Sequence, residues 1–406
     1  GYHYGETTEI FSHTYEVPPA QMAAGTYTNV TGNQTLAWGL IAGAQQAKLP
    51  LMYASYPITP ASDVLHELAR HRNFGVRTFQ AEDEIAAVGV ALGASFAGHL
   101  GITGTSGPGV ALKSETISLA LITELPMVIV DVQRGGPSTG LPTKTEQSDL
   151  LMALYGRHGE APLPVIAASS PSDAFDAAIE AIRLAIKYMT PVILLSDGYI
   201  ATSAEPWKLP DLSALPDIST TFQTALNHGE EFWPYLRDET TLARPWAIPR
   251  TAGLEHRVGG LEKQDGTGNV SYDPLNHEKM TILRENKING IADDIPDVAV
   301  DSDEGATTLV LGWGSTYASI VAGVRRVRKN GHKVAQAHLR HLHPFPKNLE
   351  SVVKSYETVL VPELNRGQLS RLMRERYLVD AKSLTKVQGK PFMAEEIEEA
   401  LMETLS

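Results

Sequence analysis

The chain has 406 residues, of which 43% are hydrophobic and 20% charged, a composition that excludes a disordered protein and fits two or three domains with large cores. Acidic residues outnumber basic ones by 47 to 34 and no Lys/Arg block occurs, which argues against nucleic acid or an anionic membrane as a partner. The absence of cysteine excludes disulfides, a catalytic thiol and any cysteine-ligated iron–sulfur cluster within this chain. Without a signal peptide or an apolar run of about 20 residues, we expect a cytoplasmic protein.

The first half of the chain has the pattern of a parallel sheet covered by helices. Residues 1–28 lack a sustained period and are expected to form an entry arm, after which short apolar runs alternate with helix-period segments up to residue 198. The strands expected in this region are 51–56, 76–80, 101–106, 127–132, 164–168 and 191–196, and helices are expected at 33–47, 61–71 and 83–98. Alternation of this kind predicts a doubly wound α/β domain over 29–198.

The alternation stops between residues 199 and 305, where proline is frequent and the sequence RVGGLEKQDGTGN is rich in glycine. We expect a long connection without regular elements, packed at a subunit boundary. Residues 306–406 resume the pattern and predict a second, smaller α/β domain. Its expected elements are strands at 307–315, 333–339 and 357–363 and helices at 316–331 and 394–405.

The sequence SYPITPASD at 55–63 follows a predicted strand. Thr59 and Pro60 are expected to cap a helix and to occupy its first position, which places the helix start at the carboxyl edge of the sheet. Open α/β sheets bind ligands at this edge, and free backbone N–H groups there suit an anion. The pattern alone leaves open a rigid turn that binds nothing.

An acidic cluster opens the segment QAEDEIAAVGVALGAS at 80–95. Acids in the first turn of a helix complement its dipole, and this accounts for Glu82 and Asp83. Glu84 leads into a stretch of Ala, Gly, Val and Ile with no polar face, which predicts a closely approached helix at a subunit interface. We interpret Glu84 as a carboxylate that is either paired or functional.

Two further loops are candidates for binding. GTSGPG at 104–109 is neither a dinucleotide fingerprint nor a P-loop, and GWGST at 312–316 also departs from the dinucleotide pattern, so NAD is not expected. The loop QRGGPSTGLPTKTEQSD at 133–149 combines Arg134 and Lys144 with several hydroxyls, a combination suited to a dicarboxylate or a phosphate. Alternatively, Glu146 and Asp149 merely balance the two cations. Three histidines in HLRHLHPFP favour a structural corner over a metal site.

Together, YPITP, the AEDEIAA helix, GTSGPG and QRGGPSTGLPTKTEQSD resemble the alpha subunit of 2-oxoacid:ferredoxin oxidoreductases, most closely the 2-oxoglutarate type. The resemblance covers roughly residues 28–405. It implies that 29–198 is a thiamine diphosphate pyrimidine-binding domain and that 306–406 resembles the C-terminal domain of transketolase.

The resemblance also assigns roles to individual residues. Glu84 matches the catalytic glutamate that hydrogen-bonds the aminopyrimidine ring and favours the tautomer that acts as a base. Arg134 matches the arginine expected to hold the 2-oxoacid carboxylate, while Thr143 and Lys144 are secondary candidates for a distal carboxylate. The remaining residues implied are Tyr56 and Thr59 for the substrate and Pro57, Ile58 and Thr105 for the cofactor.

One departure from thiamine enzymes concerns the diphosphate. Such enzymes hold it through Mg²⁺ at a G-D-G motif, whereas the nearest candidate here, Ser196-Asp197-Gly198, is expected to open the connection instead of a helix. The resemblance therefore implies a beta subunit that supplies Mg²⁺ and the diphosphate site. It also implies that this subunit carries a [4Fe–4S] cluster, which a cysteine-free chain cannot ligate, in a dimer of alpha–beta heterodimers. Longer members of the family that this sequence resembles carry a gamma-type domain ahead of the alpha region. The resemblance, together with the start at Gly1 instead of Met, implies that this domain lies upstream or on a separate chain.

The expected reaction is the reversible oxidative decarboxylation of 2-oxoglutarate with CoA to succinyl-CoA, CO₂ and reduced ferredoxin. Three alternatives stay open: a relative that acts on pyruvate or branched-chain 2-oxoacids, a non-redox transferase of the transketolase type, and a non-catalytic assembly subunit of such a complex.

Overall fold

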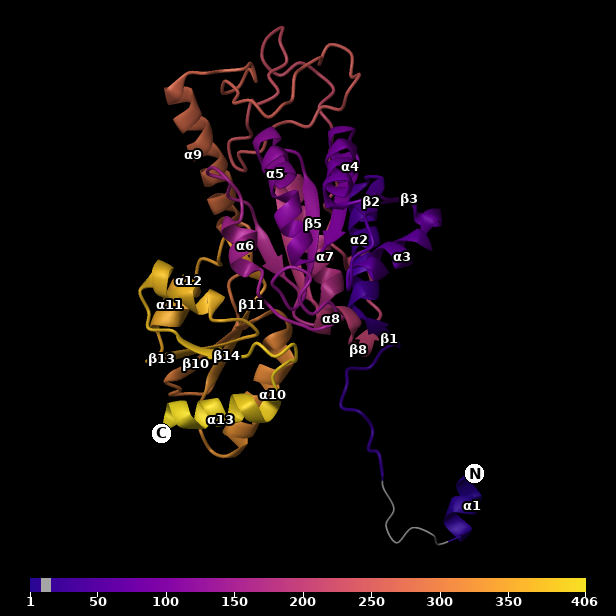
Figure 1. The fold of residues 1–406 in the computed structure, drawn as a ribbon, viewed down its shortest axis with the longest axis vertical. Coiled ribbons are helices and arrows are strands. Elements are labelled where there is room, and N and C mark those ends of the chain that lie inside the picture. Colours follow the sequence, from indigo (N-terminus) through magenta and orange to yellow (C-terminus); the bar gives the residue numbers. More distant parts are fainter. Residues whose placement is uncertain (9–15) are drawn as a thin grey trace.

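A computed structural model describes residues 1–8 and 16–406, so part of the expected entry arm lies outside the described residues (Figure 1). Within this part of the chain, the larger sheet has seven strands in the order β12-β6-β7-β5-β4-β2-β3. The sheet is parallel except for β12, which pairs antiparallel with β6. The strands are β2 (Leu51–Ser55), β3 (Val76–Gln80), β4 (Leu100–Thr105), β5 (Met127–Gln133), β6 (Val165–Ala167), β7 (Pro191–Asp197) and β12 (His341–His343).

Helices cover both faces of this sheet because its central strands are apolar on both sides. In β5, Val128 and Val130 pack on one face and Ile129 on the other. The first face is covered by α2 (Gly32–Ala47), α3 (Ser62–Ala69) and α7 (Asp173–Tyr188), and the second by α4 (Glu84–Phe96), α5 (Gly107–Thr123) and α6 (Leu150–Tyr155). The predicted doubly wound α/β fold is confirmed.

The smaller sheet has the order β14-β13-β10-β11-β9 in the described chain. One of its faces packs on α10 and α13 through Val310, Val324 and Leu401. Its elements are β9 (Val300–Ser302), β10 (Thr308–Trp313), β11 (Ala335–Leu339), β13 (Thr358–Glu363), β14 (Lys382–Thr385), α10 (Tyr317–Lys329), α11 (Leu349–Lys354), α12 (Gln368–Tyr377) and α13 (Ala394–Leu405). The other face shares an apolar core with the larger sheet.

The two units are interlocked. The strand β12 follows β11 in sequence, yet it joins the edge of the larger sheet next to β6. Gln147 fastens the units further, because its Nε2 donates to the carbonyl of Trp313 at 2.8 Å and its Oε1 accepts from the backbone N–H of Leu364 at 3.0 Å. The strand β9 also belongs to the smaller sheet although it precedes residue 306, so the sheets do not part at that residue.

The expectation that 199–305 lacks regular elements is wrong. The segment includes β8 (Ala204–Lys208), which pairs antiparallel with β1 (Tyr27–Thr31), and the 17-residue helix α9 (Pro274–Gly290). Asp273 caps α9 by accepting a hydrogen bond from the N–H of Leu275 at 3.0 Å. The other elements outside the two sheets are α1 (Tyr2–Thr7), α8 (Gly198–Thr202) and the short 3₁₀ helices η1 (Arg72–Phe74), η2 (Leu212–Ala214), η3 (Ile291–Asp293) and η4 (Gly314–Thr316).

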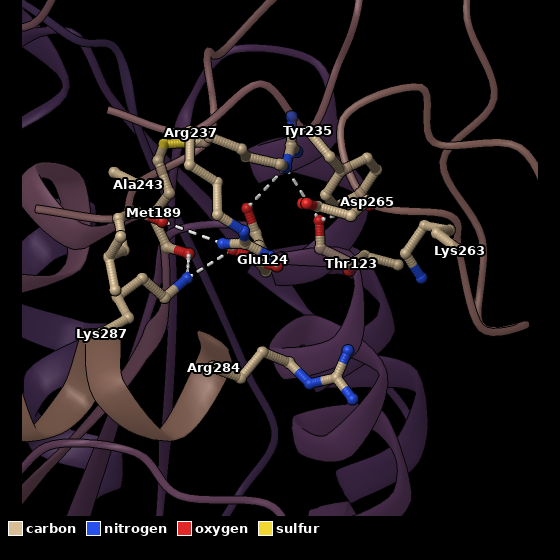
Figure 2. A network of polar contacts seen from close by, with 12 residues as sticks. Thr123, Glu124, Met189, Tyr235, Arg237, Ala243, Lys263, Asp265, Arg284 and Lys287 are labelled. Atoms are coloured by element: carbon tan, nitrogen blue, oxygen red, sulfur yellow. Dashed lines mark hydrogen bonds and ion pairs between the residues drawn. The ribbon is translucent and has the colours of Figure 1, made fainter. Parts of the chain in front are cut away.

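A buried ion cluster anchors this connection to the larger domain (Figure 2). Glu124, which ends α5, accepts two hydrogen bonds from Arg237, at 2.5 and 2.7 Å, and one from Lys287 of α9 at 2.6 Å. Arg244 donates to the carbonyls of Thr123 and Glu124, both at 3.0 Å. The connection is therefore held by charge pairing in addition to the apolar contacts that Trp246 and Ile288 make with the core of the larger domain. Among the described residues, no helix is both long and apolar enough to cross a membrane.

Candidate active site at the carboxyl edge of the larger sheet

The ends of two neighbouring strands bring two hydroxyl groups together. Tyr56 directly follows β2 and Thr105 ends β4, and their hydroxyl oxygens lie 2.8 Å apart. Gly109, in the first turn of α5, lies beneath them. A Cβ atom at this position would overlap both hydroxyls and would lie 3.0 Å from Cγ of Glu84. The last glycine of GTSGPG is thus required by packing, because the groups that converge on Gly109 leave no space for a side chain.

Glu84 is the first residue of α4 and lies half-buried beside Tyr56. The preceding Asp83 caps the helix, accepting a hydrogen bond from the N–H of Ala86 at 2.8 Å, which agrees with the predicted helix-terminus role. Burial above all raises the pKa of Tyr56; its hydrogen bond with Thr105 opposes the shift, and hydrogen bonding and charge repulsion by Glu84 add to it. The phenol therefore stays protonated and available as a donor next to the Glu84 carboxylate.

Arg134 lies at the end of β5 with only 5% of its surface exposed. Its Nη1 donates to the backbone carbonyl of Thr59 at 2.6 Å, which ties the YPITP turn to the Arg134 loop. Its Nε has no hydrogen-bond partner within residues 1–8 and 16–406. Ile58 packs against Tyr56, while Pro57 is exposed. The structure thus places Tyr56, Thr105, Glu84 and Arg134 at one edge of the sheet, as expected for the carboxyl ends of parallel strands.

The predicted capping of α3 by Thr59 is wrong. The helix begins at Ser62, and Ser62 Oγ accepts a hydrogen bond from the N–H of Ile58 at 2.8 Å. The serine hydroxyl closes the turn two residues after Pro60. Thr59 instead offers its carbonyl to Arg134, a contact 75 residues away in sequence that no local pattern indicates.

Thr143 and Lys144 lie in the part of the loop that turns back on itself. The N–H of Gly135 donates to the carbonyl of Lys144 at 2.9 Å. Both side chains are exposed, and that of Lys144 faces Gly389 of the smaller unit. In the described structure, no hydrogen bond or ion pair joins either residue to Glu84 or Tyr56. Their assignment to a distal carboxylate stays a prediction.

The sequence analysis missed two groups at this edge. Asp131, inside β5, is buried, and neither of its carboxylate oxygens has a hydrogen-bond partner among the described residues. Burial, and then the charge of Asp149, raise the pKa of Asp131; burial and Glu146 raise the pKa of Asp149 to about 7. The second group is Lys113, whose side chain is fully buried below Glu84. The available signal for Asp131 was an acid within the apolar strand MVIVDV, whereas Lys113 lies in the polar run KSET of α5 and no local pattern marks it.

Ser196-Asp197-Gly198 does open a helix, contrary to the sequence-based expectation. Asp197 caps α8 by accepting from the N–H groups of Tyr199 and Ile200 at 2.9 and 3.1 Å, and its Oδ1 also accepts from the Thr145 hydroxyl at 2.9 Å. An aspartate engaged in this way serves the turn. The part of the chain that the structure describes contains no group of three or more His, Asp or Glu residues suited to hold a metal ion.

The histidines of HLRHLHPFP have structural contacts. Nε2 of His341 lies 2.9 Å from Oε1 of Glu180, and Nε2 of His338 lies 3.1 Å from the carbonyl oxygen of Gly314. Burial lowers the pKa of both His338 and His343 to about 4, so both imidazoles are neutral near pH 7. His338 and His341 thus have protein partners at the turn between β11 and β12, as expected for a structural corner.

The site is thus a carboxylate at the start of an apolar, partly exposed helix, at the carboxyl edge of a doubly wound sheet, and comparison with known families assigns it to the thiamine diphosphate-binding class. The family model described as pyruvate flavodoxin/ferredoxin oxidoreductase, thiamine diphosphate-binding, matches residues 43–272. The model of pyruvate:ferredoxin oxidoreductase core domain II matches residues 306–401. The chain belongs to the pyruvate flavodoxin/ferredoxin oxidoreductase family, and it includes the thiamine diphosphate-binding domain of that family.

Curated relatives agree with this assignment. The 2-oxoglutarate oxidoreductase subunit KorA of Mycobacterium tuberculosis is 57% identical over 98% of this chain and 60% of the relative. The 2-oxoglutarate synthase subunit KorA of Archaeoglobus fulgidus is 32% identical over 78% of this chain and 83% of the relative. The chain therefore spans only about 60% of the length of the first of these proteins.

Solved structures show the same fold. The 2-oxoglutarate:ferredoxin oxidoreductase from Magnetococcus marinus, with 2-oxoglutarate, coenzyme A and succinyl-CoA bound, matches with a TM-score of 0.89 at 35% identity, covering 97% of this chain and 68% of the matched chain. Transketolase from Campylobacter jejuni matches 93% of this chain and 47% of its own with a TM-score of 0.54 at 8% identity, which is a likeness of fold alone.

Proposed function

We propose that the chain is the alpha subunit of a thiamine diphosphate-dependent 2-oxoglutarate:ferredoxin oxidoreductase. The reaction is the reversible conversion of 2-oxoglutarate and CoA to succinyl-CoA, CO₂ and reduced ferredoxin. The observation that supports this most directly is the convergence of Glu84, Tyr56 and Thr105 on Gly109, at the sheet edge where this fold binds its ligands. The Magnetococcus marinus enzyme, which holds 2-oxoglutarate and coenzyme A, supports the choice of substrate.

The residues present fit one half of the cofactor. Because Gly109 has no side chain, the hydroxyls of Tyr56 and Thr105 and the side chain of Glu84 can lie close to the start of α5. Glu84 is partly open to solvent, as a group that receives a heterocycle must be. For the phosphate-binding half, the described residues contain no group of three or more His, Asp or Glu residues suited to hold a metal ion, and Oδ1 of Asp197 is used by α8 and Thr145. We infer that a beta subunit supplies Mg²⁺, the diphosphate site and a [4Fe–4S] cluster.

The chemistry is then divided among this chain's residues. When bound, thiamine diphosphate supplies the carbon nucleophile that the 2-oxo group requires. Glu84 would hydrogen-bond the aminopyrimidine ring and favour its basic tautomer. Tyr56, kept protonated, would donate to an oxygen at the reacting carbon, and Arg134 would hold the 2-oxoacid carboxylate through the N–H groups that Thr59 leaves unused.

The surface around Glu84 supports the proposal of a partner. Ile85 and Phe96 of α4 are 57% and 41% exposed, and Leu112 of the neighbouring α5 is 55% exposed. Between them, Gly89 and Gly93 have no atom within 4 Å of a Cβ position, so another chain can approach the helix backbone closely. Apolar surface beside a polar site is typical of a protein interface. We infer that the beta subunit covers this surface in a dimer of alpha–beta heterodimers.

Substrate choice is tested with the assembled complex. We expect the kcat/KM for 2-oxoglutarate to exceed that for pyruvate and for 3-methyl-2-oxobutanoate by at least about tenfold, since a second carboxylate adds charge-assisted hydrogen bonds. Ferredoxin reduction with each 2-oxoacid measures this ratio. Native mass spectrometry and iron analysis of the same sample identify the partner. A preference for pyruvate would contradict the proposed substrate, and an active complex without iron would contradict the redox assignment.

Replacing Arg134 with Ala should raise the KM for the 2-oxoacid by about 10- to 100-fold, because a charge-assisted hydrogen bond contributes about 1.5–3 kcal/mol. Arg134→Lys should recover part of the loss, as it keeps the charge without the planar fork. Steady-state kinetics of the complex give KM and kcat separately, and a melting curve shows whether loss of the Thr59 contact unfolds the turn. An unchanged KM in Arg134→Ala would remove Arg134 from the carboxylate site.

A further inference from the structure

A fully buried lysine lies beneath the proposed site. Lys113, in the second turn of α5, has no exposed surface. Its Nζ donates to the backbone carbonyl oxygen of Glu84 at 2.7 Å and lies 4.9 Å from the centroid of the Tyr56 ring. Lys113 follows Gly109 by one helical turn, so the glycine that allows close approach and the lysine below it lie on the same face of α5. The ammonium thus contacts two residues of the proposed site.

Burial of the Lys113 ammonium reduces the free energy of unfolding. An ammonium removed from water loses hydration, and lysine is rarely buried completely unless it is paired. Burial lowers the pKa of Lys113 to about 8, opposed by the charges of Glu84 and Asp83 at the start of α4. A methionine of similar length would fill this space without the cost of desolvation, so packing alone does not explain a lysine here.

Lys113 and Lys287 are both buried, but they differ in the groups with which they pair. Lys287 forms an ion pair with Glu124 at 2.6 Å, inside the cluster that anchors the connection. Within residues 1–8 and 16–406, Lys113 makes no ion pair within 4.0 Å and a single hydrogen bond, to the carbonyl of Glu84. Because no carboxylate among the described residues forms an ion pair with Lys113, its positive charge acts mainly on Glu84 and Tyr56, the two site residues that it contacts.

We propose that Lys113 is a positioning residue for the Glu84 carboxylate, which holds the first turn of α4 through the Glu84 carbonyl and supplies a positive charge under the site. The hydrogen bond fixes the backbone from which the Glu84 side chain extends, and the ammonium places a positive charge beneath that carboxylate. The contact with the ring of Tyr56 holds the phenol in place. This inference rests on the proposed function, because it takes the aminopyrimidine of thiamine diphosphate as the group that Glu84 binds.

The proposal has a consequence for pH dependence. The groups that face Lys113 are Glu84 and Asp83 from α4, Tyr56 after β2 and the neutral hydroxyl of Thr105 from β4. The phenol is uncharged throughout the working range, so Lys113 is the group that titrates under the site at mild alkaline pH. Cofactor affinity should fall as pH rises through about 8, where the ammonium loses its proton.

The test compares Lys113→Met with Lys113→Arg in the assembled complex. The dissociation constant of thiamine diphosphate with Mg²⁺ is measured by fluorescence titration between about pH 6 and 9.5, together with a melting temperature for each variant. Lys113→Met should bind about tenfold more weakly at pH 7, without the alkaline decrease, and should melt no lower than the parent because a buried charge is gone. Lys113→Arg should bind well at pH 7 and lack the alkaline decrease, since guanidinium stays charged.

Two results would overturn the proposal. One is a Lys113→Met variant that binds the cofactor within about twofold of the parent at every pH. The other is weaker binding accompanied by a clearly lower melting temperature, which would mark a structural role. A parallel Glu84→Gln titration separates the two hypotheses: if Glu84→Gln weakens binding and Lys113→Met does not, only the role of Lys113 fails, whereas unchanged binding and turnover in Glu84→Gln would reject the proposed function itself.

Discussion

Glu84→Gln is expected to lower the kcat of the assembled complex by about 10²- to 10³-fold, within the range that general acid–base groups contribute. The amide has nearly the same shape as the carboxylate but no negative charge, so it would not stabilise the tautomer of the aminopyrimidine that acts as a base. The rate of 2-oxoglutarate-dependent ferredoxin reduction measures the effect. Thermal stability should hardly change, because Glu84 is half-buried and Asp83 is the residue that caps α4.

Glu82→Gln is the matched control for this substitution. It removes the same charge two residues earlier, from an exposed side chain outside α4. Turnover of the control should stay within about twofold of the parent, since charge near a helix N-terminus contributes only about 0.3–1 kcal/mol. Near-normal turnover in Glu84→Gln itself would exclude the cofactor role and would favour a non-catalytic subunit.

The second large effect concerns stability. Glu124→Gln should lower the free energy of unfolding by about 3–5 kcal/mol, because it leaves Arg237 and Lys287 buried beside a neutral amide. Burial lowers the pKa of Lys287 to about 8, with Glu124 opposing the shift. In the variant, Lys287 would therefore shed its proton more readily, which limits the loss to the lower end of this range. Urea unfolding followed by circular dichroism measures it.

A surface pair serves as the comparison. Glu350 and Lys354 form an ion pair at 2.5 Å, but their side chains are 56% and 50% exposed, so Glu350→Gln should cost less than about 1 kcal/mol. An equally small effect of Glu124→Gln would show that the cluster in Figure 2 does not anchor the connection.

The same cluster predicts how stability changes in acid. Burial would raise the pKa of Glu124, but Lys287 and Arg237 outweigh it and lower the pKa below the ordinary value of about 4.3. A carboxyl with a depressed pKa contributes stability above that ordinary value and loses it as pH falls. The parent should therefore lose more stability than Glu124→Gln on acidification below about pH 4, and parallel curves for the two proteins would contradict this explanation.

Local patterns were sufficient for most regular elements. Strands such as 127–132 are continuous apolar runs, because parallel strands are buried on both faces, and such runs are visible without knowledge of their neighbours. Glu84 was also visible, as an acid at the start of a helix without a polar face. Resemblance of these motifs to a family then indicated the cofactor and the substrate class.

Polar residues buried by pairing were not visible in the sequence. The inner face of α9 is formed by Met280, Arg284, Lys287 and Ile288, so its spacing is helical but its composition is that of a solvent-exposed segment. Lys113 was overlooked because it belongs to the polar run KSET, a composition typical of an exposed helix face. Whether a lysine is solvated or buried depends on which residues surround it, and here these come from α4 and from the end of β2.

The sequence by itself determined the class of fold, the order of strands and helices along the chain and the carboxylate at the centre of the site, because each depends on periodicity or on residues close together in the chain. Only the tertiary structure decided that β12 joins the larger sheet, that Thr59 offers its carbonyl to Arg134 and that Lys113 lies under Glu84. These contacts join residues that are far apart in the sequence. Their free energy depends on burial and on charges in space, which no local pattern records.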